Sequence, residues 1–199
     1  MPGARLIGRN DYVEMPWRNG GGVTFEIARG PAAGAIFDWR LSLATIERSG
    51  PFSNFAGYQR TIAFVSGSGC ILNGIEAQPL TLDAPGQFAM FPGAAQVTSD
   101  LIAGPCCDFN LMVREPGKIL SVNVLHATPG EGDPLAADYH NAVFCLGGTW
   151  ECVSAVDGQR IPMQLHDTLI IDPSDSARWF VHARDPAAVA LTCAWEAAR

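Results

Sequence analysis

The chain has 199 residues, of which 48% are apolar and 17% charged, so it can bury a sizeable core and is not a disordered segment. Its formal charge is −7, which argues against the basic surface that nucleic-acid binding needs. No apolar run approaches the roughly 20 residues that span a bilayer, and charged residues soon after Met1 argue against a signal peptide. We therefore expect a cytoplasmic protein with no nucleic-acid and no membrane partner.

Short apolar or alternating segments follow one another along the whole chain and predict β-strands. Turn residues such as Asn73-Gly74 separate them, and no stretch of a dozen residues keeps a helical period. At most, Pro134–His140 would form a short helix. The expected strands are Val23–Ala28, Phe37–Ile46, Thr61–Ser66, Phe88–Phe91, Phe109–Val113, Ile119–Leu125, Ala142–Leu146, Thr168–Ile171 and Ala188–Trp195. This pattern predicts an all-β protein, a sandwich or barrel of antiparallel strands.

The apolar pattern repeats weakly at an offset of 81 residues, which pairs Gly67 with Gly148 and Pro92 with Pro173. We interpret this as two tandem barrels packed as one compact unit. The first would span residues 1–138, with the N-terminal strands and a Gly-rich loop, and the smaller second would span residues 139–199. In each repeat an apolar strand runs into a Pro-centred turn, which resembles the second signature of cupin barrels.

Metal and redox sites have little support in the sequence. The six cysteines show no C-x-x-C spacing and are expected to be reduced. The four histidines all lie in the second half without an H-x-H pair, and Gln96 stands three residues after Gly93, where a cupin would carry a metal ligand. We therefore expect no metal and no cofactor.

Three of the expected strands carry small polar residues on one face. These are Thr24 and Glu26 on the first strand, Asp38, Arg40 and Ser42 on the second, and Asp108, Asn110 and Met112 on the third. One solvated face of an antiparallel sheet is the simpler explanation for any single strand. However, these faces lack lysine, and small polar groups beside an arginine favour a pocket for a small anion or amide.

Three consecutive glycines, Gly20–Gly22, follow Trp17, Arg18 and Asn19. Such a run is entropically costly, so the backbone is expected to need positive φ or a close approach by another group. A hairpin turn on Asn19-Gly20 would explain the glycines but not the flanking Trp17 and Arg18. We therefore include Trp17, Arg18 and Asn19 among the candidate binding residues.

Five segments between about Met15 and Arg114 together resemble the HutD/Ves family: Pro16–Thr24, Phe37–Ala44, Gly50–Ser53, Gly57–Thr61 and Asp108–Arg114. The resemblance implies a fold of two cupin-like barrels (a bicupin) without the usual metal ligands. One branch of the family accompanies bacterial histidine-utilisation genes and is thought to sense or limit the pathway by binding an intermediate. The other branch, Ves, is associated with stress and cold, and these motifs do not separate the two.

The polar faces and the resemblance together predict a non-enzymatic protein that binds a small carboxylate ligand of the urocanate or formylglutamate type. Arg40 or Arg60 would bind the carboxylate, and Trp17 would stack on a planar group. Asn110 and Thr24 would hydrogen-bond the polar end of the ligand. The full set of predicted ligand-binding residues is Trp17, Arg18, Asn19, Thr24, Glu26, Arg40, Ser42, Arg60, Asn110 and Met112.

Alternatives remain open at this point. A metal-free cupin-type enzyme would use Glu26 or Asp38 as its general base. A Ves-like stress protein is a further alternative, and an interaction protein could form a homodimer through the apolar residues of Phe37–Leu43. In the second repeat the offset places Leu191 and Cys193 opposite Asn110 and Met112, which predicts an apolar interior there.

Overall fold

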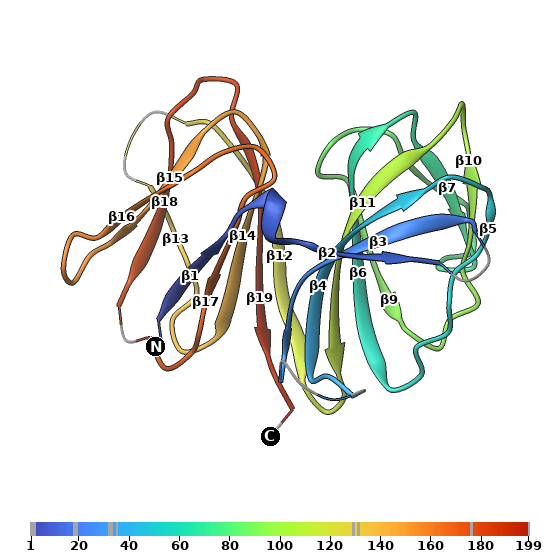
Figure 1. The fold of residues 1–199 in the computed structure, drawn as a ribbon, viewed down its shortest axis with the longest axis horizontal. Helices are drawn as coiled ribbons and strands as arrows, with labels where there is room; N and C mark the ends of the chain where they lie inside the picture. Colours follow the sequence, from blue (N-terminus) through green and yellow to red (C-terminus); the bar gives the residue numbers. More distant parts are fainter. Residues whose placement is uncertain are drawn as a thin grey trace. The chain divides into compact units, whose positions relative to one another are not determined.

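The computed structural model describes residues 3–17, 20–31, 34, 36–128, 130, 132–175 and 177–198 (Figure 1). These residues form strands β1 to β19 and one short 3-10 helix, η1 (Arg9–Asp11), which confirms the all-β prediction. Contacts divide them into a 12–118 unit and a 119–196 unit, and the latter also includes residues up to Asp11. Within the described ranges, no helix is long and apolar enough to cross a membrane.

The 12–118 unit consists of two antiparallel sheets that share one core (Figure 1). Its strands are β2 (Val13–Pro16), β3 (Gly22–Gly30), β4 (Trp39–Ile46), β5 (Gly50–Pro51), β6 (Tyr58–Gly67), β7 (Cys70–Asn73), β8 (Leu80–Leu82), β9 (Phe88–Pro92), β10 (Thr98–Leu101) and β11 (Cys106–Arg114). The order is β2-β3-β4-β11-β6-β9 in the larger sheet and β5-β10-β7-β8 in the smaller. Ile62 of β6, Leu72 of β7 and Phe91 of β9 pack into one buried cluster, so burial of apolar side chains from both sheets holds the unit together.

The 119–196 unit repeats this plan. Its strands are β1 (Ala4–Ile7), β12 (Lys118–His126), β13 (Asp133–Pro134), β14 (His140–Gly147), β15 (Trp150–Ser154), β16 (Arg160–Met163), β17 (Thr168–Ile171), β18 (Trp179–Ala183) and β19 (Val189–Glu196). The sheet orders are β1-β17-β14-β19-β12 and β13-β18-β15-β16. Val143, Trp150 and Leu169 are buried in the cluster between these sheets.

The repeat offset agrees with the observed strands. Shifting by 81 residues carries β6 onto β14, β7 onto β15, β9 onto β17 and β10 onto β18, to within two residues at their ends. The expected division after residue 138 differs from the observed one near residue 118. The reason is that β12 pairs with β19 and β1 pairs with β17, so both of these strands complete the larger sheet of the 119–196 unit.

Two details of the expected fold need correction. First, the sheets of each unit do not close into one continuous barrel, because among the described residues no edge strand of one sheet is hydrogen-bonded to an edge strand of the other. Second, the segment Pro134–His140 forms no helix. Asp138 has a φ of 65°, and Asn141 Nδ2 donates to the carbonyls of Ala136 and Tyr139, so turns replace it.

Candidate functional site

The polar faces of three neighbouring strands converge on one cavity in the 12–118 unit, with a volume of about 550 Å³. Antiparallel register brings them together, because residues in register on adjacent strands point to the same face. Across β3, β4, β11 and β6 the cavity floor has three rows, which are Thr24, Ala44 and Asp108, then Ser42, Asn110 and Ile62, then Arg40, Met112 and Arg60.

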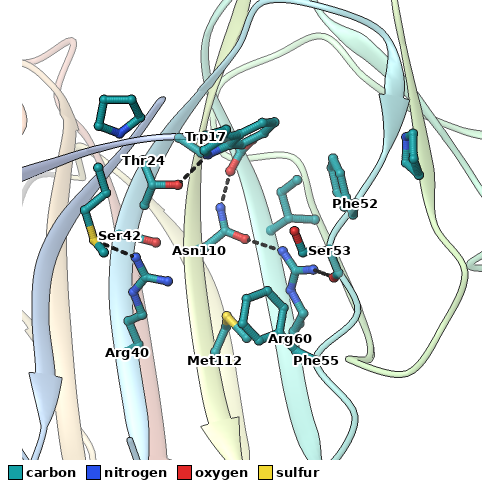
Figure 2. A pocket seen from close by; sticks show the side chains of 16 residues that line it. Trp17, Thr24, Arg40, Ser42, Phe52, Ser53, Phe55, Arg60, Asn110 and Met112 are labelled. Atoms are coloured by element: carbon teal, nitrogen blue, oxygen red, sulfur yellow. Dashed lines mark hydrogen bonds between the residues drawn. The ribbon is translucent and has the colours of Figure 1, made fainter. Parts of the chain in front are cut away.

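Two segments of the chain form the walls of this cavity. One is Met15, Pro16 and Trp17, and the other runs from Pro51 through Phe52 and Ser53 to Phe55. Figure 2 shows Trp17 and Phe52 above the floor residues Asn110 and Arg60. The aromatic rings make the cavity mostly apolar around a few polar groups, as is common in small-molecule sites.

Arg60 is the most deeply buried cation of the cavity, with 8% of its surface exposed. Its Nη2 donates to Asn110 Oδ1 at 3.0 Å and its Nη1 to the carbonyl of Ser53 at 3.4 Å, whereas its buried Nε has no hydrogen-bond partner in the described structure (Figure 2). Burial lowers the pKa of Arg60 to about 10, so it stays charged at neutral pH. Three aromatic rings lie 5.2–5.4 Å from its guanidinium carbon, those of Phe52, Phe55 and Phe91.

Asp108 lies at the buried end of a hydrogen-bonded chain that begins at Arg60. Asn110 Nδ2 donates to Asp108 Oδ1, while Asn110 Oδ1 accepts from Arg60, so the two bonds fix the orientation of the amide. Burial raises the pKa of Asp108 to about 7, and the positive charge of Arg60 and the bond from Asn110 oppose this shift. Asp108 therefore titrates in the physiological range.

Arg40 differs from Arg60 because it has a carboxylate partner. Its Nε lies 2.8 Å from Glu26 Oε2, and both side chains are 14% exposed. Glu26 also lies 3.5 Å from Arg29, and Arg40 Nη2 donates to the sulfur of Met15 at 3.4 Å. Arg40 thus has a carboxylate partner in direct contact, whereas Arg60 is linked to its carboxylate, Asp108, through the neutral amide of Asn110.

The Gly-rich loop holds Trp17 over the cavity. Gly20 has a φ of 66°, and the Trp17 amide donates to the Gly22 carbonyl at 3.0 Å. The Trp17 indole donates to Thr24 Oγ1 at 2.8 Å (Figure 2). A Cβ added at Gly22 would lie 2.1 Å from the Thr45 carbonyl oxygen, so glycine is needed for a close approach of two strands.

We expect Gly22→Ala to destabilise the protein by about 1–3 kcal/mol, the usual cost of overpacking. Gly50→Ala is the matched control, because an added Cβ there meets nothing within 4 Å. Urea denaturation of both variants checks this. If they unfold at the same urea concentration, the close approach to Thr45 is not what requires glycine.

The structure brings together most of the residues predicted to bind a ligand. Those that line the cavity are Trp17, Thr24, Arg40, Ser42, Arg60, Asn110 and Met112. Glu26 does not line it but pairs with Arg40, and Arg18 and Asn19 lie outside the described residues. Sequence reasoning missed Phe52, Ser53 and Phe55, although the Gly50–Ser53 segment contributed to the family resemblance.

The prediction of an apolar interior in the 119–196 unit is wrong at the positions equivalent to the cavity floor, where the polar residues Asn141 and Thr192 are buried. Val143 pairs with Thr192, and Asn141 pairs with Ala194. Thr192 and Ala194, not Leu191 and Cys193, therefore correspond to Asn110 and Met112. The bulged residues Val65 and Leu146 obey the offset of 81, whereas β19 follows β11 at an offset of 82, so the difference of one residue lies in β19. Within the described ranges, no group of His, Cys, Asp and Glu is placed to hold a metal ion.

Comparison with known sequences places the chain in a family. The family model described as HutD matches residues 9–190. An uncharacterised 21.2 kDa protein from the hutC 3′ region of Pseudomonas putida is 46% identical over 109 residues, which are 54% of this chain and 57% of the relative. Protein Ves of Citrobacter koseri is 34% identical over 145 residues, 71% of this chain and 73% of its own.

Solved structures are also similar to this chain over nearly its whole length. HutD from Pseudomonas fluorescens SBW25 matches with a TM-score of 0.79 at 30% identity, over 97% of this chain and 99% of that one. A cupin 2 conserved barrel domain protein from Leptotrichia buccalis matches with a TM-score of 0.59 at 15% identity, over 98% of this chain and 97% of that one, which shows the cupin-like fold alone. Because the family model matches nearly the whole sequence, the chain belongs to the HutD family.

Proposed function

We propose that the protein is a cytoplasmic, non-enzymatic sensor or limiter of histidine catabolism that binds a small carboxylate intermediate in the cavity of the 12–118 unit. Family membership indicates a role related to histidine utilisation. The observation that carries the proposal is Arg60, a buried cation in the cavity with an N–H that lacks a partner in the described structure. A ligand carboxylate would supply the charged acceptor that this guanidinium lacks.

The remaining lining fits a flat ligand with a polar end. Trp17 and Phe52 offer faces for a planar group, and Thr24, Ser42 and Asn110 offer hydrogen-bonding groups. A cavity of about 550 Å³ is within the size range of small-molecule sites. These features support an intermediate of the urocanate or formylglutamate type.

An enzyme with Glu26 or Asp38 as its base is less well supported. Glu26 is paired with Arg40, and Asp38 Oδ1 accepts from Arg114 Nε at 2.9 Å. Neither carboxylate lines the cavity, so neither is placed to take a proton from a ligand there. This argues against Glu26 and Asp38 as the base of such an enzyme.

Calorimetry with urocanate and with N-formylglutamate tests the proposal, followed by chromatography of the same mixtures after prolonged incubation. We expect saturable binding of at least one of them and recovery of the unchanged compound. Turnover of either compound would favour the enzyme instead. Absence of binding by both compounds would contradict the proposed function.

A further inference from the structure

Each arginine of the cavity has a carboxylate associated with it before any ligand enters. Its ionisable lining residues are Arg40, Arg60 and Asp108. Glu26 compensates Arg40 from outside the lining, at 2.8 Å. Asp108, which is 3% exposed, compensates Arg60 through the amide of Asn110.

The immediate surroundings of Asp108 offer no second compensating cation. On β4 and β3 the residues in register with Asp108 are Ala44 and Thr24, which carry no charge. On β6 the residue in register is Phe64, and Arg60 is the cation that acts on Asp108. Any anion that pairs with Arg60 therefore competes with Asp108 for one positive charge.

Other titratable groups near this site include two thiols and the second arginine. Cys70 of β7 and Cys106 of β11 hydrogen-bond with each other and interact electrostatically with Asp108. The hydrogen bond with Cys70 and burial raise the pKa of the Cys106 thiol. Arg40 of β4 acts on Arg60 by lowering its pKa, but its own charge is matched by Glu26.

A carboxylate bound at Arg60 would place two negative charges beside one buried cation. In a site shielded from water, two such carboxylates do not both remain ionised without a large free-energy cost, and the uptake of one proton relieves it. We propose that Asp108 takes up a proton when a carboxylate binds at Arg60, so that Asp108 couples the affinity of the cavity to pH. This inference rests on the proposed carboxylate binding.

The direction of the pH dependence follows from linkage. In the ligand-free protein the pKa of Asp108 is about 7, and a bound anion raises it further. Above pH 7 the free protein therefore loses a proton that the complex keeps, and Kd should rise by up to about tenfold per pH unit. Well below pH 7 Asp108 is protonated in both states, and Kd should not change.

The experiment uses 3-(2-furyl)acrylate, a planar carboxylate with no group of its own that titrates between pH 6 and pH 9. Calorimetry at pH 7.5 in phosphate and in Tris, whose heats of ionisation differ, gives the number of protons taken up. We expect about half a proton to one proton per ligand in the parent protein. The Asp108→Asn variant should take up none, and its Kd should be constant from pH 6 to pH 9.

Asp100→Asn is the control, because Asp100 is an exposed carboxylate of β10 in the same unit and does not line the cavity. It should behave like the parent. Binding of furylacrylate without proton uptake, or an unchanged pH dependence in Asp108→Asn, would overturn this inference and leave the proposed function standing. If furylacrylate, urocanate and N-formylglutamate all fail to bind, the proposed function falls and this inference falls with it.

Discussion

Replacing Arg60 with methionine is expected to weaken carboxylate binding by about 10- to 150-fold, which corresponds to the 1.5–3 kcal/mol of a charged hydrogen bond. Methionine keeps the apolar stem that contacts Phe52 and Phe55 but removes the planar donors. Arg60→Lys should recover only part of the affinity, because an ammonium does not grip a carboxylate with two parallel bonds. Calorimetry with urocanate measures all three proteins.

Folding should survive the loss of Arg60, although a buried partner is removed. Asp108 would lose its counter-charge, but with a pKa already near 7 it can respond by staying protonated. Arg178→Met is the matched control, since Arg178 is an exposed arginine of the 119–196 unit. Binding that is unchanged in Arg60→Met and lost in Arg178→Met would place the site in the other unit.

Replacing Asp108 with asparagine should favour the variant over the parent protein increasingly as the pH rises, because the parent alone carries the cost of ionising Asp108. The ordinary pKa of 3.8 applies in the unfolded chain and the raised value of about 7 in the fold, so the folded protein binds more protons between these values. The contribution of Asp108 to stability therefore falls as pH rises through this window. At pH 8 its cost reaches about 4 kcal/mol, an upper bound for a shift of this size.

Asparagine can accept the bond from Asn110 Nδ2 without carrying a charge, so the variant avoids this cost. Urea denaturation should show the stability difference between Asp108→Asn and the parent growing by about 2–3 kcal/mol from pH 5 to pH 8. Asp100→Asn should show no such growth. A difference that stays constant with pH would mean that Asp108 does not titrate in this window.

The strands of the two larger sheets that are rich in apolar residues could be predicted from the sequence, whereas the short strands of the smaller sheets could not. Segments such as β4 and β14 have eight residues, enough for an alternating or continuous apolar pattern to be visible. Strands of the smaller sheets, such as β8 and β16, have three or four residues, and β16 contains Pro162. Their pairing depends on contacts across the core that no local pattern records.

The floor of the candidate site could also be predicted, because alternation along β4 and β11 puts Arg40 and Asn110 on polar faces. The sequence could not show which of the two arginines has a carboxylate partner. That depends on the β-bulge between Glu26 and Ala28, which brings Arg29 into register with Arg40 beside Glu26. An irregularity of this kind leaves no periodic signal in the sequence.

A crystal structure of the protein with urocanate or N-formylglutamate bound is the most direct test of the central claim. The account predicts a ligand in the cavity of the 12–118 unit, with its carboxylate within hydrogen-bond distance of the Arg60 guanidinium and its planar part beside Trp17 or Phe52. A ligand seated in the 119–196 unit, or one whose carboxylate binds Arg40 while Arg60 keeps only its protein partners, would contradict it.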